Sequence, residues 1–195
     1  MRDFIFIIGP SGIGKTTLAK KLFEHYKSTY IEQNMVPEFI SKDGGEEVRG
    51  ELEEKTCWLN TVAMLKCFNE LGYKNVLGLD FDDLRTRDIP EVFKGYDFIT
   101  IKLISTNLKQ IQEQMKYREE GGLIDYELQQ KMNQKNLNRS PLINEFTIDV
   151  SGKDAEQVFQ EAIEIVENAK NFLEYEYVKP PKELFYSWIF SNGLR

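Results

Sequence analysis

Near the amino terminus, small residues and one lysine stand at a spacing that can bind a chain of phosphates. Residues 9–16 have the sequence GPSGIGKT, which satisfies the pattern G-x-x-x-x-G-K-[ST]. Glycines in such a loop let the backbone curl so that successive amides point inward at phosphate oxygens, and the helix that follows adds the partial positive charge of its amino end. The sequence therefore predicts a nucleotide-phosphate site made by Gly9, Pro10, Ser11, Gly12, Ile13, Gly14, Lys15, Thr16 and Thr17.

Two side chains of this loop have separate expected roles. Lys15 can reach the outer phosphates, and the hydroxyl of Thr16 can be a ligand of Mg²⁺. A carboxylate at the end of a neighbouring strand commonly completes such a metal shell, and Asp80 follows an apolar run in that way. Asp82 and Asp83 are close enough to take the same role, so the choice of carboxylate stays open.

The elements that must position these residues alternate along the chain. Apolar runs predict strands at residues 3–8, 29–33, 76–80, 97–104 and 145–150. Amphipathic stretches predict helices at about 14–26, 46–71, 106–120, 125–137 and 154–175. Strands that alternate with helices imply a parallel sheet with right-handed crossovers and helices on both faces. The expected fold is therefore α/β with three layers, and the phosphate loop directly follows its first strand.

Length and composition limit the class of protein. The chain of 195 residues suits one domain, which buries roughly 70% of its unfolded surface. A net charge of −7 argues against a nucleic-acid surface, and no apolar run approaches the length of a membrane span. Cys57 and Cys67 are too few for a disulfide scaffold, and the first strand leaves no room for a signal peptide. We expect a cytoplasmic monomer or homodimer with no nucleic-acid or membrane partner.

The loop and the order of elements together resemble the P-loop kinases of small molecules, a group that includes nucleoside, nucleotide and shikimate-type kinases. The resemblance covers residues 3 to about 173. It implies a five-stranded parallel sheet of order 2-3-1-4-5, an acceptor region between the second and third strands, and a small helical lid after the fourth. We expect a single kinase domain at 1–178, with its lid at about 116–140, and an aromatic tail at 179–195 that packs on the body or on a second subunit.

The resemblance also assigns residues to the nucleotide. Arg118 lies where these kinases carry lid arginines, and Arg139 is a second candidate. An arginine there would stabilise the charge that spreads over the transferred phosphoryl group. Residues 148–153 resemble the loop whose backbone contacts adenine, which makes Gly152 and Lys153 candidates for binding the base. ATP and Mg²⁺ are therefore the implied cofactors.

The acceptor side allows two interpretations. Glu38 follows a proline after the second strand, as does the catalytic glutamate of deoxynucleoside kinases, which takes a proton from a hydroxyl. Arg49 resembles the arginine with which nucleotide kinases grip a phosphate, and Arg85 lies near the arginine of their loop after the third strand. Deoxynucleoside kinases have an acidic-Arg-Ser motif after that strand, whereas this chain has DFDDLR. The acceptor therefore stays unnamed.

The favoured function is transfer of the γ-phosphate of ATP to a small metabolite, with a nucleoside or nucleotide as the leading acceptor. A shikimate- or gluconate-like hydroxyl compound is the alternative acceptor, and a non-kinase ATP-binding or ATPase module is the alternative class. A GTPase switch is disfavoured, because the chain has no N-K-x-D stretch to recognise guanine.

Overall fold

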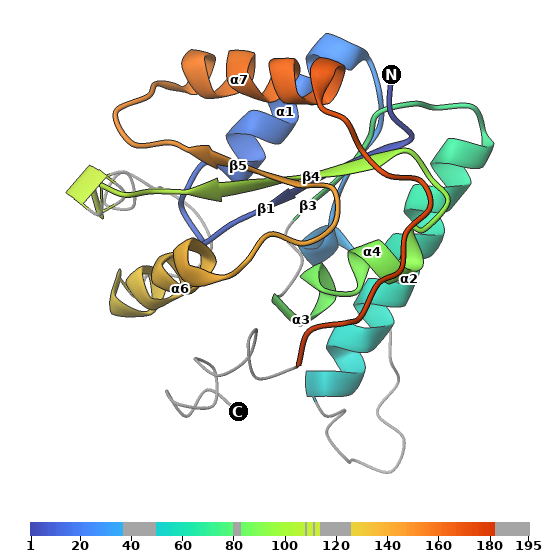
Figure 1. Ribbon diagram of the computed structural model, residues 1–195, viewed down its shortest axis with the longest axis horizontal. Coiled ribbons are helices and arrows are strands. Elements are labelled where there is room, and N and C mark those ends of the chain that lie inside the picture. Colours follow the sequence, from blue (N-terminus) through green and yellow to red (C-terminus); the bar gives the residue numbers. More distant parts are fainter. Residues whose placement is uncertain (37–49, 80–82, 108, 111, 114–125, 182–195) are drawn as a thin grey trace.

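A computed structural model describes residues 1–36, 50–79, 83–107, 109–110, 112–113 and 126–181 of the chain. Its strands are β1 (Phe4–Ile8), β2 (Tyr30–Glu32), β3 (Val76–Leu79), β4 (Phe98–Ile104) and β5 (Glu145–Asp149). All four strand pairings are parallel, and the sheet has the order β2-β3-β1-β4-β5 (Figure 1). The predicted α/β class and the predicted strand order are confirmed.

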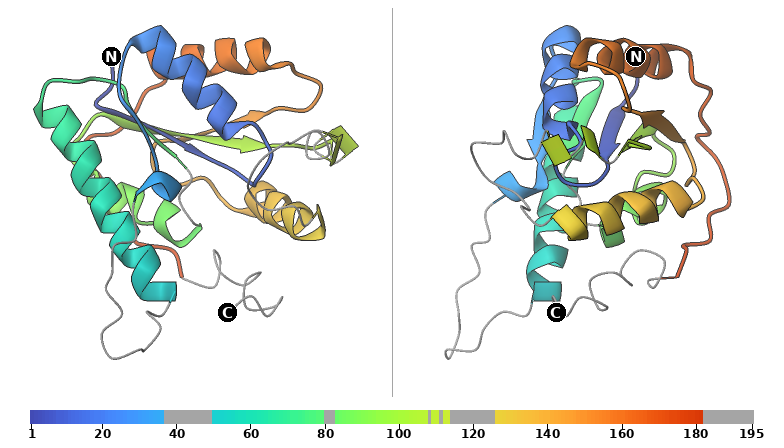
Figure 2. Two further views of the ribbon diagram at one scale, coloured as in Figure 1. Left: turned by 180° about the vertical axis from the view of Figure 1, so that it is seen from behind. Right: turned by 90° about the vertical axis from the view of Figure 1, so that its left-hand side faces the viewer.

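Helices cover both faces of this sheet (Figure 2). Two long helices lie on one face: α1 (Lys15–Tyr26) and α7 (Ala155–Asn168). The other face carries α2 (Gly50–Glu70), α3 (Asp83–Thr86), α4 (Ile89–Val92) and α6 (Tyr126–Asn138). Within the described part of the chain, no helix combines the length and the apolar character that a membrane span requires.

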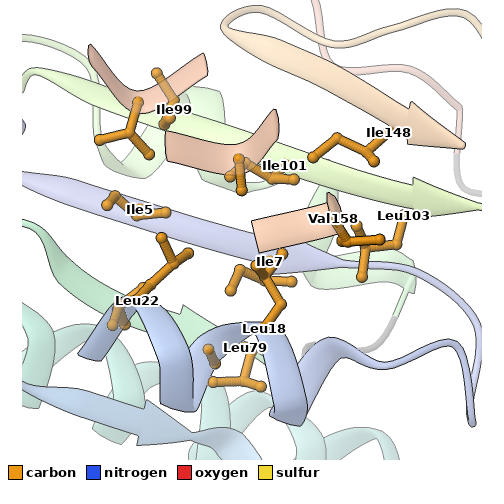
Figure 3. Close-up of a cluster of buried hydrophobic side chains, with 14 of the residues drawn as sticks. Ile5, Ile7, Leu18, Leu22, Leu79, Ile99, Ile101, Leu103, Ile148 and Val158 are labelled. Atoms are coloured by element: carbon orange, nitrogen blue, oxygen red, sulfur yellow. The ribbon is translucent and has the colours of Figure 1, made fainter. Parts of the chain in front are cut away.

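The central strands are apolar on both sides because both sides are covered. Ile5 and Ile7 of β1 face α1 and α7, in a cluster that includes Leu18 and Leu22 of α1 (Figure 3). Phe4 and Phe6 point to the opposite side, where they pack with the ring of Phe93 at centroid distances of 4.8 and 4.7 Å. These two clusters hold β1, and with it the start of the phosphate loop, in the middle of the fold.

The face of the sheet beneath α6 is charged. Lys102 Nζ lies 3.1 Å from Glu145 Oε1, and Arg139 Nη2 lies 2.9 Å from Glu145 Oε2. The side chains of Lys102, Arg139 and Glu145 are only 4%, 6% and 0% exposed, respectively. Two cations therefore share one fully buried carboxylate.

Asn133 attaches α6 to the end of β4. Its side-chain amide accepts a hydrogen bond from Ser105 N at 3.0 Å and donates one to Ser105 O at 2.7 Å. An asparagine that binds both backbone groups of one residue fixes the helix against the strand end without apolar packing. The register of α6 on the sheet thus depends on polar contacts.

The last helix is shorter than the sequence predicts. We expected it to extend from 154 to about 175; α7 begins as expected, with Asp154 and Gln157 forming a capping box, but it ends at Asn168. Arg2, from the first residues of the chain, donates to the carbonyls of Val166 and Ala169 at the end of α7. These contacts satisfy carbonyl groups that a longer helix would use for its own hydrogen bonds.

After α7 the chain crosses to the opposite layer as an extended segment, residues 169–181, which we call the C-terminal strap (Figures 1 and 2). Tyr175 OH donates to Pro90 O at 2.5 Å, and Tyr177 OH donates to Arg87 O at 2.7 Å. Lys179 Nζ lies 2.8 Å from Asp88 Oδ1. The strap therefore holds α3 and α4, two short helices that the sequence analysis missed. Of the expected tail, residues 182–195 lie outside the described residues.

We expect the buried carboxylate of Glu145 to be essential for stability. Glu145→Gln would leave Lys102 and Arg139 buried without their negative partner, and removing one member of such a group costs about 3–5 kcal/mol. Urea denaturation would measure this loss of unfolding free energy. Glu156→Gln is the matched control, because Glu156 pairs with Lys21 at 2.8 Å on the surface, where such pairs contribute little. Equal effects of the two substitutions would contradict this assignment.

Candidate nucleotide site

The phosphate loop lies where the sequence placed it, between the end of β1 and the start of α1. Its three glycines all have positive φ: 146° at Gly9, 78° at Gly12 and 102° at Gly14. Gly14 is the N-cap residue of α1 and contributes no side-chain cap. Such a backbone turns its amides toward one concave side, and the helix directly adds its positive end. The loop therefore has the shape and polarity of a phosphate cradle.

Gly9 must be glycine for a steric reason as well. A Cβ atom at this position would stand 2.7 Å from the carbonyl oxygen of Leu103 in β4 and 3.2 Å from the side chain of Ile13. The loop can therefore curl at this place only because residue 9 has no side chain.

The polar side chains of the loop are partly accessible. Lys15 Nζ donates to Pro10 O at 3.2 Å, so the lysine folds back across the loop. Thr16 is half-buried and Thr17 is exposed in the first turn of α1. Lys15 and Thr16 are thus both partly exposed in the first turn of α1, directly after the cradle.

A second loop, residues 149–153 after β5, carries the expected base-binding positions and is called the base loop here. Gly152 has φ of 70°, and a Cβ atom there would meet nothing within 4 Å, so its surroundings are open. The Lys153 ammonium is paired with Glu161 of α7. Lys153 therefore already has a carboxylate partner, whereas the space at the Cβ position of Gly152 is open.

Hydrogen bonds join the base loop to the end of β4. Ser151 Oγ accepts from Thr106 N at 2.8 Å and from Asn107 N at 2.9 Å, and Thr106 Oγ1 donates to Asp149 Oδ2 at 2.7 Å. Partial burial alone would raise the pKa of Asp149, but hydrogen bonds from Ser151 and Thr106 outweigh it and hold this pKa below its ordinary value. Asp149 is therefore an ionised anchor for the loop near neutral pH.

Comparison with known proteins gives a result at the level of structure alone. No family model matches the chain, and no curated protein sequence matches it. A sugar kinase from Janibacter sp. HTCC2649 matches with a TM-score of 0.60 at 17% identity, over 85% of this chain and 95% of that chain. A gluconokinase from Sinorhizobium meliloti 1021 matches with a TM-score of 0.58 at 20% identity, over 81% and 87%. A thymidylate kinase from Candida albicans matches with a TM-score of 0.58 at 17% identity, over 84% and 90%.

The fold is that of the P-loop kinases of small molecules. The similarity in fold extends over more than four fifths of the chain. At identities of 17–20% the likeness is one of architecture.

The P-loop kinase fold brings some of the predicted site residues together. The phosphate loop and Gly152 both lie at the carboxyl edge of the sheet, after β1 and β5. Arg139 directly follows α6, and its guanidinium is bound to Glu145 at the start of β5, at the opposite edge of the sheet from Gly152. Arg85 lies in α3 and pairs with Asp88 at 3.2 Å. Both arginines thus have carboxylate partners within the protein.

Several predicted positions lie outside the described residues: Glu38, Arg49, Asp80, Asp82 and Arg118. Asp83 is the first residue of α3. The roles expected for these residues stay predictions.

Glu32 is a carboxylate at the same edge that the sequence analysis missed. It ends β2, is buried, and accepts a hydrogen bond from the hydroxyl of Tyr30. It pairs in register with Leu79, the residue before Asp80. The signal was present in the sequence, because Glu32 ends a short apolar strand in the same way as Asp80 does. A buried acidic group therefore ends the strand next to β3, at the carboxyl edge of the sheet.

We expect Gly9→Ala to destabilise the fold and to abolish ATP binding, because the new methyl group would displace the loop from Leu103. Overpacking of this kind costs about 1–3 kcal/mol. Gly95→Ala is the control, since Gly95 also has positive φ, 86°, but nothing lies within 4 Å of its Cβ position. Thermal unfolding and calorimetric titration with ATP would measure both effects. Similar behaviour of the two variants would show that the contact with Leu103 is unimportant.

Proposed function

We propose that the protein is an ATP- and Mg²⁺-dependent kinase that transfers the γ-phosphate of ATP to a small metabolite, with a nucleoside or nucleotide as its leading acceptor. The observation that carries this proposal is the phosphate cradle at residues 9–14, with Lys15 folded across it. The proposed kinase domain comprises residues 1–178 and its lid residues 116–140; it works in the cytoplasm as a monomer or homodimer.

The residues of the loop fit a nucleotide triphosphate. Lys15 neutralises the outer phosphates as negative charge moves during transfer, and the backbone amides of residues 11–14 hold the inner ones. The Thr16 hydroxyl and the carboxylate of Asp80 would hold Mg²⁺, which supplies further neutralisation of the phosphate oxygens. Arg118 is the proposed lid arginine.

The acceptor lies beside β2 and β3 in this proposal. Glu38 accepts the proton of a hydroxyl acceptor, or Arg49 and Arg85 bind the phosphate of a nucleotide acceptor. A hydroxyl compound like shikimate or gluconate is the second candidate. Two of the similar structures, titled a sugar kinase and a gluconokinase, favour it, whereas the thymidylate kinase favours a nucleotide.

ADP release from ATP, measured with and without a panel of nucleosides, nucleotides and sugar acids, tests the function. Turnover that one class of acceptor stimulates supports the kinase and identifies the class. Turnover that no acceptor changes would instead indicate an ATPase, and the kinase proposal would fail.

Lys15→Ala should lower turnover by about two orders of magnitude or more, because it removes a charge that stabilises the transition state. Lys20→Ala is the control, since Lys20 is an exposed lysine of the same helix. Circular dichroism would verify that both variants fold. A folded Lys15→Ala variant with the parental rate would exclude a catalytic phosphate loop.

Three substitutions distinguish the two kinds of acceptor. With a hydroxyl acceptor, Glu38→Gln should reduce kcat sharply and leave the affinity for ATP unchanged, because a positioned base is lost. With a monophosphate acceptor, Arg49→Ala and Arg85→Ala should raise the KM of the acceptor while Glu38→Gln has little effect. Steady-state kinetics with the acceptor from the panel would measure both quantities. If Glu38→Gln is inert with a hydroxyl acceptor, the assignment of Glu38 is wrong.

A further inference from the structure

The chain leaves β4 toward the expected lid through residues that are bound to the base loop. Thr106 and Asn107 are held by Ser151 and Asp149, as described above. Asn107 Oδ1 then accepts a hydrogen bond from the backbone amide of Gln110 at 3.4 Å, in the manner of an N-cap residue. Gln110 therefore stands in a fixed position relative to the base loop, one turn into the segment that leads to the lid.

The side chain of Gln110 makes a paired contact with the backbone of the base loop. Its Oε1 accepts from Gly152 N at 2.8 Å, and its Nε2 donates to Val150 O at 3.4 Å. The base loop thus presents one donor, Gly152 N, and one acceptor, Val150 O. A primary carboxamide can bind both at once because its oxygen and its NH₂ group are adjacent.

An adenine edge has the same arrangement of groups. A ring nitrogen accepts a hydrogen bond, and the adjacent amino group donates one. Adenine could therefore accept from Gly152 N and donate to Val150 O, in place of the carboxamide. Gly152 itself has no side chain to meet the ring, and nothing lies within 4 Å of its Cβ position.

The position of this backbone pair is compatible with a nucleotide whose phosphates lie on the phosphate loop. The base loop follows β5 and the phosphate loop follows β1, and β4 lies between these strands. Two strand spacings separate them, or roughly 10 Å. A ribose and its phosphate can bridge this separation along the carboxyl edge of the sheet.

We propose that Gln110 is a placeholder for the nucleobase: its carboxamide occupies the pair formed by Gly152 N and Val150 O, and the base of the bound nucleotide replaces it. This inference rests on the proposed function, because it requires a nucleotide on the phosphate loop. Gln110 is only half-buried, so it can leave the pair without opening the core. Since Gln110 precedes the expected lid, arrival of the base also releases a contact between the segment after β4 and the base loop.

The placeholder lowers the apparent affinity for ATP. A site that is open for only a fraction of the time has its dissociation constant increased by the inverse of that fraction. If Gln110 occupies the pair for about 70–90% of the time, its removal should tighten ATP binding about three- to tenfold. A ligand without a base does not use the pair, so its affinity should not change.

Calorimetric titration of Gln110→Ala with ATP and with inorganic tripolyphosphate tests the proposal. We expect tighter binding of ATP by about three- to tenfold and unchanged binding of tripolyphosphate. Gln112→Ala is the matched control, because it removes the same side chain from the same helical segment two residues further along, on a different side of the helix. It should leave both affinities as in the parent protein.

Amide hydrogen exchange of Gly152 gives an independent measurement. In the free protein, the amide hydrogen of Gly152 should exchange faster in the Gln110→Ala variant than in the parent protein. Binding of ATP should restore the protection of this amide in the variant. Tripolyphosphate should not restore it, since it carries no base.

The outcomes separate the placeholder from the proposed function. If the parent protein binds neither ATP nor tripolyphosphate, the nucleotide site is wrong and the placeholder falls with it. If ATP binds but Gln110→Ala leaves its affinity unchanged or weaker, the placeholder alone is wrong. Equal tightening of ATP and tripolyphosphate would also overturn it, because the effect would then not involve the base.

Discussion

The close approach of Gly9 to the carbonyl of Leu103 determines where the phosphate loop lies, and it makes the end of β4 the centre of the site. Within a few residues after Leu103, Ser105 binds Asn133 of α6, and Thr106 binds the base loop. The phosphate loop, α6 and the base loop are therefore positioned by one strand end. A displacement of that strand end would move all three together. The contacts there are made by backbone groups and short polar side chains, which have little freedom to move.

The charges beneath α6 extend this polar construction into the core. A buried carboxylate shared by Lys102 and Arg139 is costly to desolvate and is stable only with well-placed partners. It ties the residue that follows α6 to the sheet, because Arg139 binds Glu145 of β5. It also gives Arg139 a partner inside the protein, at the start of β5. The ion pairs of Glu145 therefore help to fix the end of α6 against the sheet, in the layer that supports the expected lid.

The sequence predicted those features that short stretches of chain determine. The five strands and the phosphate loop depend on local apolar runs and on glycine spacing, and the strand order followed from the resemblance to P-loop kinases. The end of α7 could not be predicted, because Arg2 binds its last carbonyls from more than 160 residues away in the chain. The short helices α3 and α4 likewise depend on the strap. Glu32 had a recognisable signal, but the predicted strand at 29–33 extends past it, so Glu32 was not identified as a carboxylate at a strand end.

The two sides of the site are held in different ways. The phosphate loop is fixed by the central strands, whereas Arg85, which we propose binds the acceptor, pairs with Asp88, and Asp88 also binds Lys179 of the strap. Burial alone would lower the pKa of Lys179, but its bonds to Asp88 and Glu91 outweigh this and raise it, so the lysine stays charged. An anionic acceptor that drew Arg85 away would therefore leave Asp88 with a cationic partner. Because an unpaired buried carboxylate would be costly, the strap reduces the free energy required to move Arg85 toward a ligand.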